Sequence, residues 1–182
     1  MSEFVLETPR LRLRLLRLDE TDIEAISAIF ADPVAMQFFP STYNPIDVEE
    51  FIQRQLHRYA TDGHGLWAVT LKTTGQVIGD CGLACQLVNN TAEVEVGYHI
   101  NCSFQKQGYA TEAALGCMKL AFGQLGISRL ISMIRPENVP SRRVAEKNGM
   151  TVEAELFWHD YVHLLYSINR SASRGANVQD SI

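Results

Sequence analysis

Hydrophobic and polar residues alternate in several short stretches of the chain, a pattern typical of β-strands with one buried face. The first stretch places Leu11, Leu13 and Leu15 on one face and two arginines on the other. Thr-Thr-Gly at 73–75 and Val-Asn-Asn at 88–90 are turn sequences that connect three central strands as hairpins. The later strand patterns cover residues 66–72, 76–87, 92–100 and 129–134, and two closing segments that end near residue 168. Seven strands are therefore predicted.

Helical spacing of apolar residues appears between these strands. A first helix is capped by Asp19 or Thr21 and ends near Ala31. Three more helices are predicted over residues 46–59, from 107 or 108 to about 125, and over residues 140–148. The element order β-α-α-β-β-β-α-β-α-β-β predicts the α/β (α+β) class, with helices covering a mixed, mostly antiparallel sheet.

The composition fits one globular domain. Of the 182 residues, 46% are hydrophobic and 20% are charged, which is ordinary for such a domain. The chain lacks both an apolar run long enough for a membrane span and the basic start of a signal peptide. We expect one domain over residues 1–168, a polar and flexible tail over residues 169–182, and a cytoplasmic protein with no membrane partner.

The charge distribution narrows the ligand classes. The net charge of −5 argues against nucleic acid, which requires a basic surface. Basic residues nevertheless outnumber acidic ones by seven to three between residues 105 and 147. This segment suits an anionic ligand, whereas the acidic remainder suits a cationic one.

The four cysteines indicate neither a disulfide framework nor a metal site. Cys81 and Cys85 share one face of a predicted strand and lie about 13 Å apart along it, too far for a disulfide. Neither these two nor Cys102 and Cys117 show zinc-ribbon spacing. We expect free thiols in a reducing compartment and no metal.

A strand, a glycine-bearing loop and a helix follow one another between residues 94 and 125. Backbone N–H groups at the start of such a helix form an anion site, and Gly108 permits close approach of the backbone to a ligand. The alternative is an ordinary loop with a helix-capping glycine. The loop consists of Gln105, Lys106, Gln107, Gly108, Tyr109 and Ala110.

This loop and a second cluster, N-V-P-S-R-R-V-A-E-K-N-G-M at 138–150, together resemble motifs of the GCN5-related N-acetyltransferase superfamily. The start of the chain, E-T-P-R-L-R-L-R at 7–14, and the segment at 75–83 are similar to its RimJ/RimL branch of ribosomal-protein N-terminal acetyltransferases. The resemblance implies acetyl-CoA as cosubstrate. It also implies a seven-stranded sheet that is splayed between its fourth and fifth strands, residues 92–100 and 129–134.

For acetyl-CoA, the resemblance implies that the loop at 105–110 binds the pyrophosphate. A bulge near the end of the preceding strand is expected to present the backbone of Tyr98 and Ile100 to the pantetheine arm. The amide near His99 or Ile100 is expected to polarise the thioester carbonyl. Asn138 is expected to bind a pantetheine amide and Ser141 to lie near the sulfur; alternatively, either residue simply caps the following helix.

For catalysis, the resemblance implies that Glu95 is the general base, acting through a water, with Glu93 a weaker candidate. The alternative is a solvated carboxylate or an ion pair with arginine. Ser141 is the expected general acid, because Ala145 stands where many relatives have a tyrosine. His99 stands where relatives usually have tryptophan, and is either a packed side chain, a second base or a substrate contact.

The function implied by the resemblance is direct transfer of acetyl from acetyl-CoA to a primary amine. A protein N-terminus is favoured as acceptor, since an α-amine with a pKa near ~7.7–8.0 is neutral far more often than lysine at ~10.4. A small-molecule amine is the alternative acceptor, and a non-catalytic acetyl-CoA-binding module the alternative function. Residues 38–59 are expected to line the acceptor site, in a monomer or a homodimer.

Overall fold

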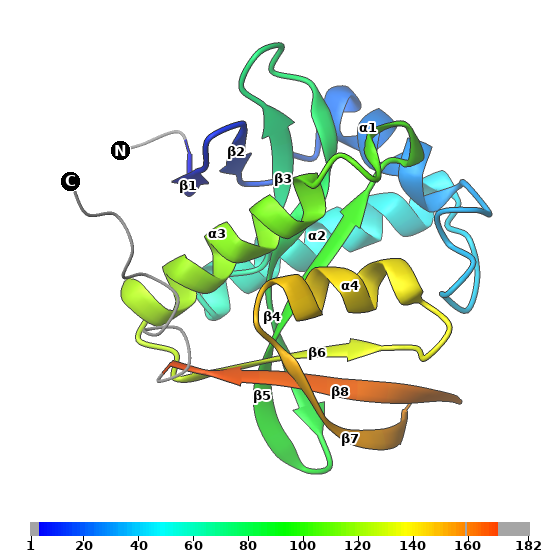
Figure 1. Cartoon of the computed structure of the whole chain (residues 1–182). Coiled ribbons are helices and arrows are strands. Elements are labelled where there is room, and N and C mark those ends of the chain that lie inside the picture. The colour runs from blue at the N-terminus through cyan, green and yellow to red at the C-terminus, as the bar shows by residue number, and fades with distance from the viewer. Residues whose placement is uncertain (1–3, 159, 171–182) are drawn as a thin grey trace.

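A computed structural model describes residues 4–158 and 160–170, and their strands form one mixed sheet in the order β1-β2-β3-β4-β5-β6-β8-β7 (Figure 1). A 3-10 helix at Cys102–Phe104 leads into α3. None of the helices in these two ranges is long and apolar enough to cross a membrane. The elements are β1 (Leu6–Glu7), β2 (Leu11–Arg14), α1 (Glu20–Phe30), α2 (Pro45–Thr61), β3 (Leu66–Leu71), β4 (Val77–Val88), β5 (Thr91–Ile100), α3 (Tyr109–Gly123), β6 (Arg129–Ile134), α4 (Val139–Lys147), β7 (Thr151–Trp158) and β8 (Tyr161–Asn169).

The predicted class and element order are confirmed, but the number of strands was wrong by one. The additional strand is β1, whose two residues pair with β2 through Leu6↔Leu13 and Glu7↔Arg12. Two residues are too few to produce a recognisable alternation, so the sequence pattern does not reveal them. The predicted tail lies outside the described part from residue 171 onwards.

The two helical layers cover opposite faces of the sheet (Figure 1). On β3, Trp67 and Val69 belong to the core cluster beneath α3, whereas Leu66 and Ala68 belong to the cluster beneath α1 and α2. This division follows from the alternation of side chains along a strand. The sheet therefore separates an α3/α4 side from an α1/α2 side.

The sheet opens between β5 and β6. The hairpin of β4 and β5 is paired from Val88↔Thr91 to Gly79↔Ile100, whereas the parallel pairing of β5 with β6 is confined to Glu95↔Ile131. The predicted splay between these strands is confirmed.

The expected bulge near the end of β5 was wrong, because the ladder with β4 has no register shift there. Gly79 faces Ile100 at this end, and any side chain at Gly79 would collide with the His99 carbonyl oxygen. Glycine therefore lets the two strands stay closely paired. The irregular registers lie in β3, at Val69/Thr70, and in β7.

Candidate active site

The loop before α3 has the backbone conformation of an anion site. Lys106 and Gly108 have φ angles of +61° and +84°, and α3 begins at the next residue, Tyr109. Successive backbone N–H groups in such a turn converge on one point, and the first N–H groups of a helix have no partners within it. Glycine at the N-cap has no side chain that competes for these groups. The loop therefore offers backbone donors to a phosphate.

The two glutamines of the loop hold its shape. Gln105 donates from Nε2 to the Ile100 carbonyl at 2.9 Å, and Gln107 donates from Nε2 to the Ser103 carbonyl at 3.3 Å. Both side chains therefore brace the loop while staying exposed. The exposed Lys106 adds a positive charge to the backbone groups of the loop.

Arg10 adds a positive charge beside this loop. Its Nη1 donates to the Gln107 carbonyl at 3.0 Å, and its guanidinium lies 4.4 Å from the centre of the Tyr109 ring. Its Nε forms an ion pair with Glu112 at 2.6 Å. Arg10 was predicted only as part of the first-strand motif, because a contact between residues 97 positions apart has no local signal.

Tyr98 and Ser141 meet across the opening of the sheet. The Tyr98 hydroxyl lies 2.9 Å from the Ser141 carbonyl oxygen and 2.9 Å from Ser141 Oγ. Burial raises the pKa of Tyr98 well above its ordinary value, so the phenol stays protonated. Only the backbone of Tyr98 was predicted to belong to the site; its hydroxyl gives the candidate acid Ser141 a protonated neighbour.

Asn138 caps α4. Its Oδ1 accepts a hydrogen bond from the Ser141 backbone N–H at 3.2 Å. This is the capping role that the sequence analysis named as an alternative, and it fixes Ser141 at the start of the helix. A bond from Asn138 to pantetheine stays a prediction.

Glu95 lies where β5 and β6 diverge. Its Oε1 accepts the Met133 backbone N–H at 3.0 Å, and its Oε2 accepts from Gln86 Nε2 at 2.9 Å. Burial raises the pKa of Glu95, and the hydrogen bond from Met133 opposes that shift. Where the backbones of β5 and β6 separate, the Glu95 carboxylate thus takes the place of a β5 carbonyl as the hydrogen-bond acceptor for β6.

Glu93 has a different role. It forms an ion pair with Arg129 at 3.1 Å, and Arg129 also binds Glu153 at 2.8 Å. The arginine pairing considered for Glu95 is thus found at Glu93, which binds β5 to β6 at the closed end of the opening.

His99 is held by a buried carboxylate on the α1/α2 side. Its Nδ1 lies 2.9 Å from Oδ1 of Asp80, which is 0% exposed, and its own side chain is 18% exposed. Phe30 and Phe39 pack against the imidazole, with ring centres at 4.9 and 5.1 Å. Burial lowers the pKa of His99, but the charge and hydrogen bond of Asp80, helped by the charge of Glu95, outweigh it and raise the pKa above its ordinary value.

Asp80 was not among the residues predicted for the site, although the sequence contains a signal for it. Asn89 and Asn90 form the two-residue turn of the β4–β5 hairpin, both with positive φ. A two-residue turn fixes the register of a hairpin, so residues equidistant from it face each other on the same side. Counting outward from this turn places Asp80 opposite His99, as the structure does.

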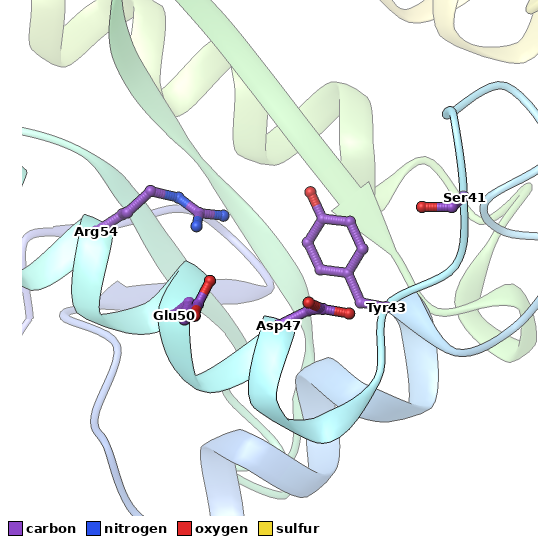
Figure 2. A pocket seen from close by; sticks show the side chains of 5 residues that line it. All are labelled: Ser41, Tyr43, Asp47, Glu50 and Arg54. Carbon is purple, nitrogen blue, oxygen red and sulfur yellow. The ribbon is translucent and has the colours of Figure 1, made fainter.

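A pocket of about 220 Å³ lies on the same side of the sheet, within the stretch expected to bind the acceptor. Figure 2 shows Arg54 and Tyr43 facing each other across it, with the carboxylates of Asp47 and Glu50 along the α2 side. Tyr43 packs on Phe30 with ring centres 5.1 Å apart. Because Phe30 also contacts His99, two aromatic rings connect the pocket with β5. Its lining residues are Ser41, Tyr43, Asp47, Glu50 and Arg54.

The cysteines are free thiols, as predicted, and Cys81 and Cys117 lie with their sulfur atoms 3.6 Å apart in the buried core. Among residues 4–158 and 160–170, no group of three or more His, Cys, Asp or Glu side chains is arranged to hold a metal ion.

Comparison with known proteins agrees with the geometry of the site and with the family resemblance seen in the sequence. The model of the acetyltransferase (GNAT) domain matches residues 10–151. The uncharacterised protein YkkB of Bacillus subtilis is 31% identical over 145 residues, which cover 80% of this chain and 84% of YkkB.

Solved structures agree with the fold. An acetyltransferase from Agrobacterium tumefaciens is 29% identical, with a TM-score of 0.80 over 93% of this chain and 96% of that one. A candidate ribosomal-protein-serine acetyltransferase from Vibrio cholerae is 25% identical, with a TM-score of 0.75 over 93% of this chain and 99% of that one.

Proposed function

Since the chain belongs to the acetyltransferase (GNAT) domain family and is an acetyl-CoA-dependent acetyltransferase, we propose that its acceptor is the α-amine of a protein N-terminus. The observation that carries the proposal is the pocket beside α2, whose carboxylates attract a cationic amine toward β5. Its volume of about 220 Å³ suits the end of a polypeptide and is small for a drug-sized ligand.

Two further points favour an α-amine. Near neutral pH it loses its proton far more readily than a lysine side chain does, so less energy is needed to make it a nucleophile. The Vibrio cholerae protein with the same fold, at 25% identity, is described as acting on a ribosomal-protein serine. A serine or alanine N-terminus is small enough for the pocket.

For acetyl-CoA, the proposal assigns the pyrophosphate to the backbone N–H groups before α3, with the charge of Arg10 beside them. The pantetheine arm lies along the opened edge of β5, where Tyr98 and Ile100 offer backbone groups that β6 does not pair. Ser141, next to the Tyr98 hydroxyl, gives a proton to the departing sulfur. These residues position acetyl-CoA with its acetyl group at the opening of the sheet.

Glu95 lies beside that opening, and the proposal gives it the task of attracting and orienting the acceptor's ammonium group. Both of its oxygens already accept one hydrogen bond from the protein, and each has a second lone pair for the amine or a water. It therefore contributes through its charge and position at the point where the amine meets the thioester.

A free amino acid derivative is the second candidate acceptor, because one specific feature favours it. Arg54 follows the carboxylates along α2 and also lines the pocket (Figure 2), so the pocket offers both a cationic and an anionic partner. A small zwitterion needs both charges matched, whereas a protein N-terminus needs only the carboxylates.

The test is mass-spectrometric detection of acetyl transfer to pooled peptides that begin with serine, alanine or methionine, mixed with free amino acids and polyamines. We expect acetylation of peptide α-amines, located at the first residue by fragmentation. Acetylation restricted to free amino acids or polyamines would contradict the proposal and replace it with the small-molecule function.

A further inference from the structure

The pair formed by Asp80 and His99 is not explained by acetyl-CoA binding, nor by packing alone. Asp80 is wholly buried, and burying a carboxylate is costly unless it is paired. Within the part of the chain that the structure describes, its Oδ1 contacts His99 Nδ1 at 2.9 Å and its Oδ2 has no hydrogen-bond partner. His99 is therefore the main partner of this buried charge.

The contact also determines which nitrogen of His99 is available. A carboxylate at Nδ1 keeps a proton on that nitrogen, so in the neutral ring Nε2 carries the free lone pair. Phe30 and Phe39 hold the ring in place, and its side chain is 18% exposed. Among the residues described, the hydrogen bond of the imidazole is made through Nδ1. The nitrogen that accepts a proton is thus unoccupied on a partly exposed ring.

The position of His99 on β5 suits the reaction. Positions 95, 97 and 99 share one face of the strand, and Glu95, Gly97 and His99 are all partly exposed there. Gly97 contributes no side chain between the carboxylate and the imidazole. This leaves a partly exposed strip on the α1/α2 side of β5, with Glu95 at the opening of the sheet and His99 near the strand's end.

We propose that His99, oriented by Asp80, is the catalytic base that takes the proton from the acceptor amine. The inference rests on acetyl transfer itself and holds for any primary amine acceptor. Asp80 is a positioning residue, since it acts through His99. Glu95 retains its task of attracting and orienting the amine.

The ammonium group of the acceptor loses a proton to His99 Nε2, directly or through one water, and the neutral nitrogen attacks the acetyl carbon. A C–N bond forms and the C–S bond breaks, so that the sulfur leaves with the electron pair. The second proton that the nitrogen loses passes through the Ser141 hydroxyl or a water to the sulfur, which leaves Ser141 protonated as before. The amide nitrogen keeps one hydrogen, and the imidazolium of His99 later returns its proton to solvent.

The pH dependence follows from the groups that face His99. Asp80 on β4 and Glu95 on β5 both favour its protonated form, and its neighbours from α1 and the following loop, Phe30 and Phe39, are uncharged. Only neutral His99 accepts a proton, so activity falls as pH drops through the pKa of His99. Removing the charge of Asp80 lowers that pKa and moves the acidic limb of the profile to lower pH.

The experiment compares wild type with H99Q, D80N and E95Q, using a serine-initiated peptide and hydroxylamine as acceptors. We expect H99Q to lower kcat for the peptide by about 100-fold at neutral pH, a typical contribution of general base catalysis. Hydroxylamine is largely uncharged at this pH, so its acetylation should change little. In D80N the acidic limb should move to lower pH, and in E95Q it should persist. H57Q, at an exposed site on α2, is the matched control.

A structural role for His99 would reduce transfer to both acceptors alike, and that result would overturn the proposal. Loss of the acidic limb in E95Q with its retention in H99Q would also overturn it, since Glu95 would then be the base. Should H99Q not fold, NMR titration of the wild-type imidazoles decides: His99 must titrate above the ordinary ~6.5 and lower in D80N. If wild type leaves the peptide unmodified, the proposed acceptor is wrong, and the same enzymes are compared on the amine that the pooled assay identifies.

Discussion

One face of β5 carries the Tyr98 side chain, which contacts Ser141 of α4 near the loop that precedes α3. The other face carries Glu95 and His99, which lie toward α1 and α2. The first region offers mostly backbone: N–H groups before α3 and strand groups at the opened edge of the sheet. The second offers side chains, namely the imidazole of His99 and the carboxylates of Asp80, Glu95, Asp47 and Glu50. A common cosubstrate needs only a fixed backbone shape, whereas the choice of amine and the handling of its proton need particular side chains.

The largest effect, a loss of acetyl-CoA affinity, is expected at Gly108. The backbone anion site before α3 depends on the left-handed conformation of this residue. In G108V a β-branched residue must adopt φ near +84°, with its Cβ 3.4 Å from Arg10 Nη2. A strain of about 2–3 kcal/mol, relieved by movement of the loop, corresponds to roughly 30- to 100-fold weaker binding. Calorimetric titration with acetyl-CoA measures it.

G126V is the matched control, because Gly126 has a similar φ of +69° but lies beyond the end of α3. It should lower the melting temperature and leave acetyl-CoA binding intact. Equal loss of binding in both variants would mean that general destabilisation, and not the anion site, explains G108V.

A smaller effect is expected at the contact between Tyr98 and Ser141. S141A should lower kcat about tenfold, with acetyl-CoA affinity retained, because a protonated hydroxyl near the sulfur is lost. Y98F should produce a similar decrease, and the double variant should be little worse than either single one, since the two hydroxyls act as a unit. Steady-state kinetics of all three variants checks this, and strictly additive losses would contradict the coupling.

E95Q tests the carboxylate that lies at the opening of the sheet, on the α1/α2 side of β5. We expect kcat/KM to fall about three- to tenfold, the equivalent of one weakened charge-assisted hydrogen bond, with acetyl-CoA binding unchanged. E93Q, two residues away on the same strand face, breaks the contact with Arg129 and should not affect transfer. A greater loss of activity in E93Q than in E95Q would show that the junction of β5 with β6 matters more than the carboxylate at the opening.

The smallest effect is expected in the pocket beside α2. The double variant D47N/E50Q should raise the KM for a cationic acceptor about threefold, because partly exposed charges contribute modestly and are screened by salt. E49Q, on the same helix but outside the pocket lining, should have no effect. The difference between the two should disappear at high salt; if it does not, the carboxylates act through α2 structure, since Asp47 also caps that helix.

The features that could be predicted from the sequence are those set by residues close together in the chain. The start of α3 and the hairpins depend on local turn residues and on alternation, and these predictions agree with the structure; the splay between β5 and β6 was expected from the family resemblance. Asp19 at the N-cap of α1 and Asn138 at that of α4 follow from the same short-range chemistry.

The features that could not be predicted from the sequence depend on contacts between residues far apart in the chain. Nothing near Arg10 in the sequence indicates that it reaches Gln107, and nothing near Glu95 indicates that its carboxylate binds the Met133 amide. The bulge expected in β5 was wrong because Gly79 of β4, on the partner strand, permits a regular ladder. The Asp80–His99 pair could be predicted only in part. The hairpin turn fixes which two residues face each other, but the burial of the pair depends on α1 packing over it.

Hydrogen exchange with and without acetyl-CoA tests the division between the two faces most directly. We expect slower exchange at residues 98–110 and 138–141, with residues 41–54 unchanged until an amine acceptor is added. Unchanged exchange at residues 98–110, or protection by acetyl-CoA alone at residues 41–54, would contradict this division.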